Sequence, residues 1–592
     1  MASSSALINS NHENLRPLGG CSLQQIFSGL PAAPGVGIGR LYTYTSLPNA
    51  MHSGAVEQST SPSQEWQRYL DARQKVDDEL AQLAQMDNSL LSDIFLVHQE
   101  ILHDRLLTDG VRAAIDRGTS AATATQQTTS ELVQLFQNLS DDYFASRAVD
   151  IRDVGQRLLA HLSGVSLARQ LAALPPNTIL LAEDLTPFDA THLSPQSVTG
   201  IALAASAPTA HTAILARSLG IPLICGVGSA ILRLPPGLLA VVDGLHGRLL
   251  VEPDAELLTR YELTGRRLLA LRINAESHSH EAALTREGRR VLVHANVNSQ
   301  EDMLQMAGSG ADGIGLLRTE YLFRERTKPP TVEEQLEAYR LIRSQTRGEI
   351  LTVRLLDIGG DKPVRYLPQI SESNPFLGVR GIRLLLQHPE LLRDQLQALV
   401  SLAQDSSFSG VVRILVPMVS KIVEVQRVLA MLDDIPGYGE QHRPGGRLQV
   451  GLMIEVPAAA LLADRLAPLV DFFSIGTNDL AQYTLAADRV NSAVASLASP
   501  LDPSVLRLIA MTCQAGQMAE IPVSICGEMA GDPSIFPLLF GLGVTEVSVV
   551  APAVALVKEA VRQTDGDGAR RLAERALQAN RAQDVHRLLH PE

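Results

Sequence analysis

From about Arg290 onward, short apolar segments alternate with helical ones, and this rhythm limits the fold more than any other feature of the chain. Helical patterns such as Thr331–Ser344 and Pro389–Gln404 separate eight segments that we interpret as buried strands. Eight strands alternating with helices are typical of a (β/α)8 barrel, and the strand count makes an open doubly wound sheet the weaker alternative. The predicted strands are 291–297, 313–318, 351–358, 411–417, 449–455, 471–476, 521–526 and 546–550.

The first half of the chain has a different organisation. At 592 residues the chain is too long for one core, so we expect several domains. A tight glycine-rich turn that enters a strand within 28–42, and strand patterns at 178–182 and 198–204, predict an α/β region. Between the first two, apolar residues recur with the helical period, which predicts an inserted helical bundle with helices at Leu90–Leu107, Ala121–Leu139 and Asp141–Leu162. The expected fold class is therefore α/β and multidomain.

Composition and charge narrow the class of partner. Apolar residues make up 45% of the chain and charged ones 19%, as in folded soluble proteins. A net charge of −14 argues against nucleic acid and anionic membranes as main partners. We find neither a signal peptide nor an apolar run long enough for membrane insertion, and the four scattered cysteines suggest reduced thiols in a cytoplasmic protein.

Polar residues follow several predicted strands, at the ends where such barrels carry their active sites. A purely structural role would favour apolar or turn residues at most of these positions. Finding three arginines, two carboxylates, an amide and a thiol there predicts an active site. The candidates are Arg318, Arg354, Glu455, Asn478, Asp479, Arg489 and Cys526.

These residue types suit one kind of ligand. Arginine binds phosphate or carboxylate with two parallel hydrogen bonds. Glu455 and Asp479 offer hard oxygen ligands, and Mg²⁺ commonly takes one or two protein carboxylates. Cys526 could be a nucleophile, a core residue or a general acid. Together they predict a small, highly charged ligand whose departing form picks up a proton, a description that phosphoenolpyruvate meets.

A second candidate site lies in the α/β region, in the stretch Pro208–Pro222. His211 opens a predicted helix, which Gly220 and the proline at the end of the stretch bring to a stop. Unpaired backbone N–H groups and the positive end of the helix dipole surround the first turn, and they favour an anion such as a phosphoryl group on the ring. The alternative is an ordinary polar residue in a first turn.

One motif in the barrel region imitates a nucleotide-binding loop. Gly308–Gly313 matches the GxGxxG pattern of dinucleotide-binding proteins. That loop needs a strand before it and a helix after it, whereas here the predicted helix precedes and the strand follows. We therefore predict an ordinary helix-to-strand turn.

Several motifs together resemble enzyme I of the bacterial phosphoenolpyruvate-dependent phosphotransferase system. The segment around His211 reads T-A-H-T-A-I-L-A-R-S-L-G-I-P and is similar to the phosphohistidine signature, which the dikinases that act on pyruvate share. The barrel region contains D-G-I-G-L-L-R-T-E, L-D-I-G-G-D-K, N-P-F-L-G-V-R, E-V-P-A-A-A, D-F-F-S-I-G-T-N-D-L-A-Q-Y-T and C-G-E-M-A-G-D. The chain departs from the family's usual glycine-rich loop at Ser206, Ala207 and Ala210, and along the eighth strand.

The resemblance implies a role for each matching residue. It makes His211 the phosphorylated histidine and Cys526 the proton donor to enolpyruvate. It assigns Glu455 and Asp479 to a bound Mg²⁺. The implied substrate-binding residues are Arg318, Arg354, Asn478, Asp479 and Arg489, with Arg380 a second-rank candidate.

The resemblance also implies boundaries and partners. The phosphoryl group would pass from phosphoenolpyruvate through His211 to the carrier HPr, releasing pyruvate, and the barrel would form a homodimer. We expect residues 1–26 to be a flexible lead, 27–54 and 166–254 the α/β phosphohistidine domain, 55–165 the helical HPr-binding insert, 255–283 a helical linker on which that domain swivels, and 284–592 the phosphoenolpyruvate-binding and dimerisation TIM barrel.

Three alternatives remain at this stage. A paralogue in the nitrogen branch would phosphorylate an HPr-like regulatory carrier instead. A dikinase or synthase would use ATP, but would need a nucleotide-binding domain for which the residues before His211 leave little room. A regulatory paralogue would only bind partners, which the intact barrel motifs disfavour.

Overall fold

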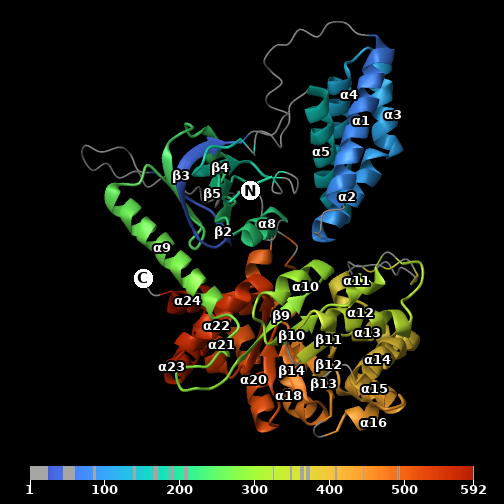
Figure 1. Cartoon of the computed structure of the whole chain (residues 1–592), viewed down its shortest axis with the longest axis vertical. Coiled ribbons are helices and arrows are strands. Elements are labelled where there is room, and N and C mark those ends of the chain that lie inside the picture. Colours follow the sequence, from blue (N-terminus) through green and yellow to red (C-terminus); the bar gives the residue numbers. More distant parts are fainter. Residues whose placement is uncertain are drawn as a thin grey trace, which may run out of the picture. The chain divides into compact units, whose positions relative to one another are not determined.

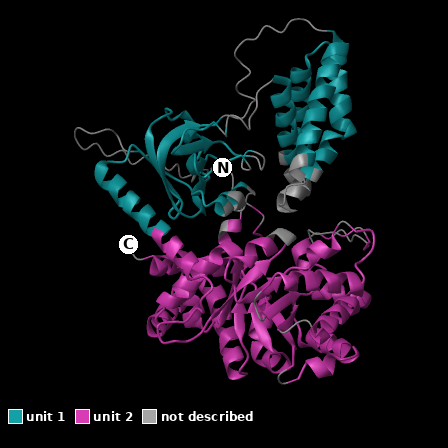
Figure 2. Ribbon diagram, in the orientation of Figure 1, with its two compact units in different colours: residues 1–269 teal, residues 270–592 magenta. Residues whose placement is uncertain are grey.

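The computed structural model falls into two compact units, residues 1–269 and 270–592, which are described separately (Figure 2). The residues that the structure describes are 25–44, 61–84, 89–137, 142–163, 171, 173–185, 189, 192–205, 211–324, 326–346, 350–359, 364, 366–367, 372, 374–406, 410–443, 446–489, 491 and 494–590. Most of the predicted lead and the predicted glycine-poor loop at 206–210 lie outside them.

An eight-stranded mixed sheet forms the α/β part of the first unit (Figure 1). Its strand order is β1-β8-β7-β3-β4-β5-β6-β2, with β3 to β6 parallel and the other pairs antiparallel. The stretch 28–42, predicted as a glycine-rich turn entering a strand, contains the turn at Gly35 and the strand β3, and the short strand β2 lies before that turn. The bounds are β1 Gln25–Ser28, β2 Leu30–Ala33, β3 Val36–Thr43, β4 Thr178–Ala182, β5 Val198–Leu203, β6 Leu223–Cys225, β7 Leu239–Asp243 and β8 Arg248–Val251.

A group of five helices follows β3 in the chain (Figure 1). Their buried faces include Tyr69, Val76, Leu80 and Leu158. The one helix predicted at 90–107 is two helices, because the Asp104 carboxylate accepts a hydrogen bond from the Leu106 N–H and starts a new helix. The bounds are α1 Pro62–Ala84, α2 Ser89–Leu102, α3 Arg105–Asp116, α4 Ala121–Gln137 and α5 Asp142–Ser163.

Two more helices matter for function. Helix α8, His211–Leu219, begins at His211 as predicted, and Gly220 follows it with a positive φ of 68°. Helix α9, Ala255–Ser277, has 23 residues, of which only Ala275 is buried. No described helix in either unit is long and apolar enough to cross a membrane.

A closed barrel of eight parallel strands forms the second unit, which confirms the predicted fold class. Its helices surround the strands (Figure 1). The third strand is shorter than predicted, since it ends at Arg354 rather than at 358. The bounds are β9 Leu292–Val297, β10 Gly313–Leu317, β11 Ile350–Arg354, β12 Val411–Val416, β13 Leu448–Ile454, β14 Phe472–Ile475, β15 Val523–Ile525 and β16 Glu546–Val550.

The helices of the second unit lie mostly between these strands in sequence. The GxGxxG segment is the predicted helix-to-strand turn, because α10 ends at Ala307 and β10 begins at Gly313. The bounds are α10 Gln300–Ala307, α11 Glu320–Phe323, α12 Val332–Ser344, α13 Ile382–Gln387, α14 Pro389–Gln404, α15 Ile422–Asp433, α16 Tyr438–Gln441, α17 Pro457–Leu461, α18 Ala463–Leu466, α19 Thr477–Leu485, α20 Pro503–Met518, α21 Phe536–Leu542, α22 Val554–Gln563, α23 Gly566–Leu577 and α24 Ala582–Leu589.

A buried charge cluster closes the amino-terminal end of the barrel. The Arg413 guanidinium donates to both carboxylate oxygens of Glu546, at 2.7 and 3.2 Å, and the Nε2 of His294 lies 3.6 Å from the same carboxylate. Burial works against the charged form, but His294 and Arg413 outweigh it and lower the pKa of Glu546 to about 2.

Replacing this carboxylate should destabilise the barrel. Glu546→Gln leaves the buried Arg413 without its counter-charge, and we expect the free energy of unfolding to fall by about 3–5 kcal/mol. Urea unfolding followed by circular dichroism measures it, with Glu574→Gln on the exposed face of α23 as control. Because folding lowers the pKa of Glu546, the difference in unfolding free energy between the wild type and Glu546→Gln should be largest above pH 4.5. It should shrink as the pH falls toward 2 and Glu546 becomes protonated. A difference in unfolding free energy that does not change with pH would contradict this account.

Candidate active site

A cavity at the carboxyl ends of the barrel strands brings together seven of the residues predicted from the sequence. Parallel strands end at the same face, so loops far apart in the sequence meet there. The lining residues are Leu316, Arg318, Arg354, Met453, Glu455, Gly476, Asn478, Asp479, Arg489, Cys526 and Gly527. Of the predicted barrel residues, only Arg380 is not among them.

The arginines of the cavity differ in how firmly they are held. Arg354 ends β11 and is 5% exposed. Its guanidinium donates to Glu320 at 2.7 Å and lies 3.2 Å from the Asp357 carboxylate. Arg318 follows β10 directly and has an exposed side chain. These two arginines give the cavity cationic groups that can bind an anion, in a protein whose net charge is −14.

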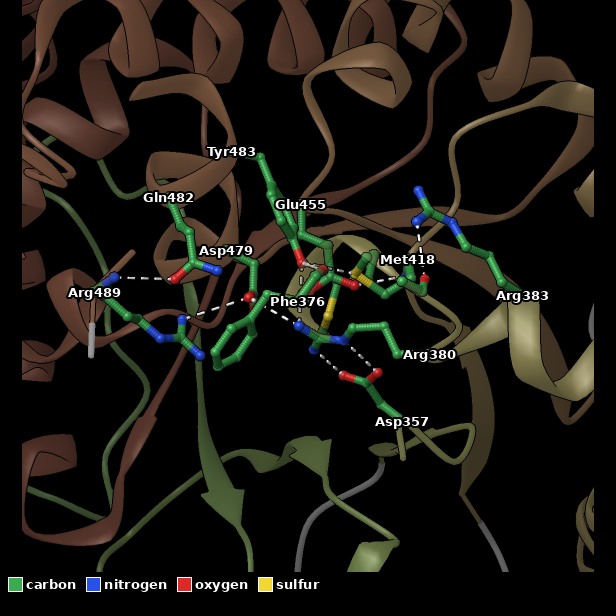
Figure 3. Close-up of polar contacts among 12 residues, drawn as sticks. Asp357, Phe376, Arg380, Arg383, Met418, Glu455, Asp479, Gln482, Tyr483 and Arg489 are labelled. Carbon is green, nitrogen blue, oxygen red and sulfur yellow. Dashed lines mark hydrogen bonds and ion pairs between the residues drawn. The ribbon is translucent and has the colours of Figure 1, made fainter. Parts of the chain in front are cut away.

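Arg380, from the loop before α13, does not line the cavity but contacts Asp479, which does (Figure 3). Asp357 accepts two of its hydrogen bonds, at 3.2 and 2.7 Å. A third nitrogen lies 3.5 Å from Asp479 and donates to the Tyr483 hydroxyl at 3.2 Å. This bonding holds the Asp479 side chain from one side, while Arg489, 3.6 Å away, faces it from the other.

Two carboxylates, Glu455 and Asp479, share the cavity. Burial, together with the negative charges of Asp479 and Asp357, raises the pKa of Glu455 to about 8, although Arg354 and Arg380 oppose the shift. A divalent cation beside both groups would favour their charged forms, so the pair fits Mg²⁺.

The surroundings of Glu455 also decide which of its oxygens is available. The backbone N–H of Met418 donates to Oε1 at 2.6 Å, and Met418 reaches this position with a positive φ of 57°. Oε2 lies on the side of Gly476, where an added Cβ would come within 3.2 Å of it. Since Gly476 lines the cavity, Oε2 is the oxygen with which Glu455 would hold a cation there. Among the described residues no cluster of three or more metal-ligating side chains occurs, and Mg²⁺ needs no such cluster.

Cys526 follows β15 and is 6% exposed. Its thiol donates toward the Ile475 carbonyl at 3.5 Å and accepts a hydrogen bond from the Ser474 hydroxyl at 3.3 Å. Burial raises the pKa of this thiol, which keeps it protonated at neutral pH. A protonated thiol is a poor nucleophile, so these surroundings fit a proton donor or a core residue better than a nucleophile.

Sequence reasoning missed the residues that hold the others in place. Glu320, Asp357, Met418 and Tyr483 bind or orient the predicted residues rather than line the cavity. Glu320 and Asp357 do lie in the motifs R-T-E and L-D-I-G-G-D-K, so their position was a usable signal. Nothing in the sequence indicates the positive φ of Met418.

The second candidate site lies in the first unit. His211 is the first residue of α8, so its backbone stands at the positive end of the helix dipole. The next residue anchors this turn, because the Thr212 hydroxyl donates to the Leu185 carbonyl at 2.7 Å. The imidazole of His211 lies outside the described side chains, as do Ser206, Ala207 and Ala210.

Three family models match the chain in order. They are the N-terminal region of PEP-utilising enzymes at residues 28–147, their mobile domain at 174–247 and their PEP-binding domain at 273–566. All three belong to enzymes that use phosphoenolpyruvate, and together they cover both units.

Curated relatives agree with these matches. A phosphoenolpyruvate-protein phosphotransferase of Bacillus sp. (strain S) is 36% identical over 96% of this chain and 98% of its own length. One from Haloferax volcanii is 40% identical over 88% of this chain and 91% of its own. A multiphosphoryl transfer protein of Rhodobacter capsulatus is 41% identical over 84% of this chain, which spans 59% of that longer relative. The chain is thus an enzyme of phosphoenolpyruvate-dependent phosphotransfer and belongs to the phosphoenolpyruvate-protein phosphotransferase family.

Proposed function

We propose that this enzyme transfers the phosphoryl group of phosphoenolpyruvate to His211 and then to a histidine of the carrier HPr, as the first step of sugar uptake. The observation that carries the proposal is the single cavity into which Arg318, Arg354, Cys526 and the two carboxylates project. Because phosphoenolpyruvate is made inside the cell, the proposal places the enzyme in the cytoplasm. The homodimer through the barrel stays a prediction.

In this proposal the charged residues of the cavity bind and orient the substrate. Arg318, Arg354 and Arg489 hold the phosphate and carboxylate groups by charge-assisted hydrogen bonds, and Asn478 donates a further one. Glu455 and Asp479 would hold Mg²⁺, which supplies positive charge to the transferring phosphoryl oxygens. Arg380 keeps Asp479 and Asp357 in place. Positioning and charge supply most of the rate, since phosphoryl transfer asks little covalent chemistry of the protein.

A neutral ring nitrogen of His211, Nε2 by family resemblance, attacks phosphorus in line with the enolate oxygen. The N–P bond forms as the P–O bond breaks, and enolpyruvate remains in the cavity. Cys526 then gives its thiol proton to the methylene carbon while the enolate electron pair closes the carbonyl, which yields pyruvate. Water returns a proton to the thiolate. The phosphorylated His211 must next reach HPr, so the proposal requires the first unit to move on the linker at 255–283.

Removing the metal should separate the two half-reactions. With EDTA present, we expect phosphorylation of the enzyme by phosphoenolpyruvate to stop, because the positive charge that Mg²⁺ would supply to the phosphoryl oxygens is then missing, while the negative charge of Asp479 stays in the cavity. Transfer from already phosphorylated enzyme to HPr should stay largely intact, since it does not use the cavity. Radiolabel on each protein measures both steps, and excess Mg²⁺ provides the control by restoring the first. Loss of both steps, or of neither, would contradict the assignment.

Incubating the purified enzyme with phosphoenolpyruvate and each carrier in turn tests the proposal as a whole. Labelling of HPr supports the sugar branch, whereas preference for an HPr-like regulatory carrier supports the nitrogen-branch alternative. Labelling of the enzyme by ATP would point to a dikinase instead. Labelling of no carrier by a phosphorylated enzyme would overturn the second half of the proposal.

A further inference from the structure

Glu528 pairs with Asn478 across the gap between two neighbouring strand ends. Asn478 is the second residue of α19, which follows β14, and Glu528 stands two residues after Cys526 at the start of the 3-10 turn Glu528–Gly531, which follows β15. The Asn478 side-chain amide donates to the Glu528 carboxylate at 2.9 Å, and its carbonyl oxygen accepts from the Glu528 backbone N–H at 3.1 Å. Neither the sequence motifs nor the mechanism gives Glu528 a role.

This pair fixes which way the Asn478 amide faces. A backbone N–H can only donate, so the side-chain oxygen of Asn478 must face it. A carboxylate can only accept, so the NH₂ group must face the Glu528 side chain. One of the two N–H donors of that NH₂ group is then taken by Glu528. The other has no partner in the part of the chain that the structure describes, and Asn478 lines the cavity, so this donor can serve a ligand.

Close packing keeps the two loops in register. A Cβ added to Gly527 would meet the Thr477 hydroxyl at 1.7 Å and the Thr477 backbone nitrogen at 2.9 Å, so only glycine fits between Cys526 and Glu528. The Cys526 N–H donates to the Ile475 carbonyl at 3.1 Å. The backbone next to Cys526 therefore packs tightly against the backbone next to Asn478, which fixes the position of one residue relative to the other.

We propose that Glu528 is a positioning residue for substrate recognition: it orients the Asn478 amide so that its free N–H points at the phosphoenolpyruvate anion. The inference rests on the proposed function, because it takes Asn478 as a substrate-binding residue. It adds that the orientation depends on an acceptor oxygen at position 528 and not on the negative charge there. Without the carboxylate of Glu528 the side-chain amide of Asn478 can rotate. For part of the time its N–H then no longer points at the substrate.

Steady-state kinetics of enzyme phosphorylation test this with three variants. Glu528→Ala should raise KM for phosphoenolpyruvate about three- to tenfold, the range of one exposed hydrogen bond, and leave kcat near the wild-type value. Glu528→Gln keeps an acceptor oxygen in place and should restore the wild-type KM. Asp532→Ala removes a nearby carboxylate whose hydrogen-bond partner among the described residues is Ser534, and should change nothing. Thermal unfolding checks that the exposed substitutions leave the fold intact.

A double variant separates this inference from the proposed function. Asn478→Ala alone tests the proposed function, which requires KM to rise. If Glu528 acts through Asn478, then Glu528→Ala should add no further loss in the Asn478→Ala background. A full additional loss, a wild-type KM in Glu528→Ala, or a Glu528→Gln variant as poor as Glu528→Ala would overturn the inference. A wild-type KM in Asn478→Ala would instead remove Asn478 from the substrate site, and with it both claims.

Discussion

The His211→Ala variant is expected to take up no ³²P from labelled phosphoenolpyruvate. Alanine has no nitrogen that can accept a phosphoryl group, and the positive end of α8 cannot replace one. The barrel, in the other unit, keeps its whole cavity, so the variant should still bind the substrate. Filter binding of labelled protein measures the loss. In the wild type the label should be lost in acid and kept in alkali, as expected of phosphorus on nitrogen.

A second histidine of the first unit, in the turn between β7 and β8, provides the matched control. His246, after β7, has a half-exposed side chain whose Nδ1 lies 2.8 Å from the Asp243 carboxylate. His246→Ala should be labelled like the wild type. Persistent labelling of His211→Ala would remove this histidine from the mechanism, and equal loss in both variants would show a general defect of the domain rather than a missing nucleophile.

The cavity could be predicted because of a rule of barrels. Each strand of a (β/α)8 barrel delivers its following residues to the same face, so Arg318, Glu455 and Cys526 converge although they lie far apart in the chain. The strand pattern was therefore enough to predict that these residues lie close together, without any knowledge of side-chain contacts. Their chemical roles are the predictions that the variants below and above test.

Arg380 shows where such reasoning stops. Its place in the N-P-F-L-G-V-R turn made it a candidate for the substrate site, which stays a prediction, but the sequence does not show which carboxylate lies nearest to it. Asp357 lies close enough to accept two hydrogen bonds from it, and that distance follows from packing between loops. The end of β11 at Arg354 could not be predicted either, because the apolar run continues past this residue in the sequence.

Local chemistry also decided the remaining misses. The break between α2 and α3 depends on one capping carboxylate, Asp104, inside an otherwise continuous helical pattern. The left-handed backbone of Met418 lets its N–H reach Glu455, although nothing about methionine favours a positive φ. Such a conformation persists only where surrounding contacts hold it, and it lies here at the predicted metal-binding carboxylate.

Replacing Cys526 should produce the second large effect. In Cys526→Ala, enolpyruvate left in the cavity loses its proton donor, and we expect turnover to fall by about 10²–10⁴, the usual contribution of a general acid. Phosphorylation of the enzyme in a single turnover should be affected less than pyruvate formation, because the N–P bond forms before the proton moves. Rapid quench followed by separate assays of labelled enzyme and pyruvate distinguishes the two steps.

Two further variants exclude packing as the cause. Cys526 also touches an apolar cluster with Leu316, Leu415, Met453 and Phe472, so alanine removes volume as well as a proton. Cys526→Ser keeps nearly the same shape but carries a much weaker acid, and should stay slow if acidity matters. Cys513→Ala removes another buried thiol, on α20 and outside the cavity, and should leave the rate unchanged. A serine variant at the wild-type rate would make Cys526 a packing residue, because shape without acidity would then be enough.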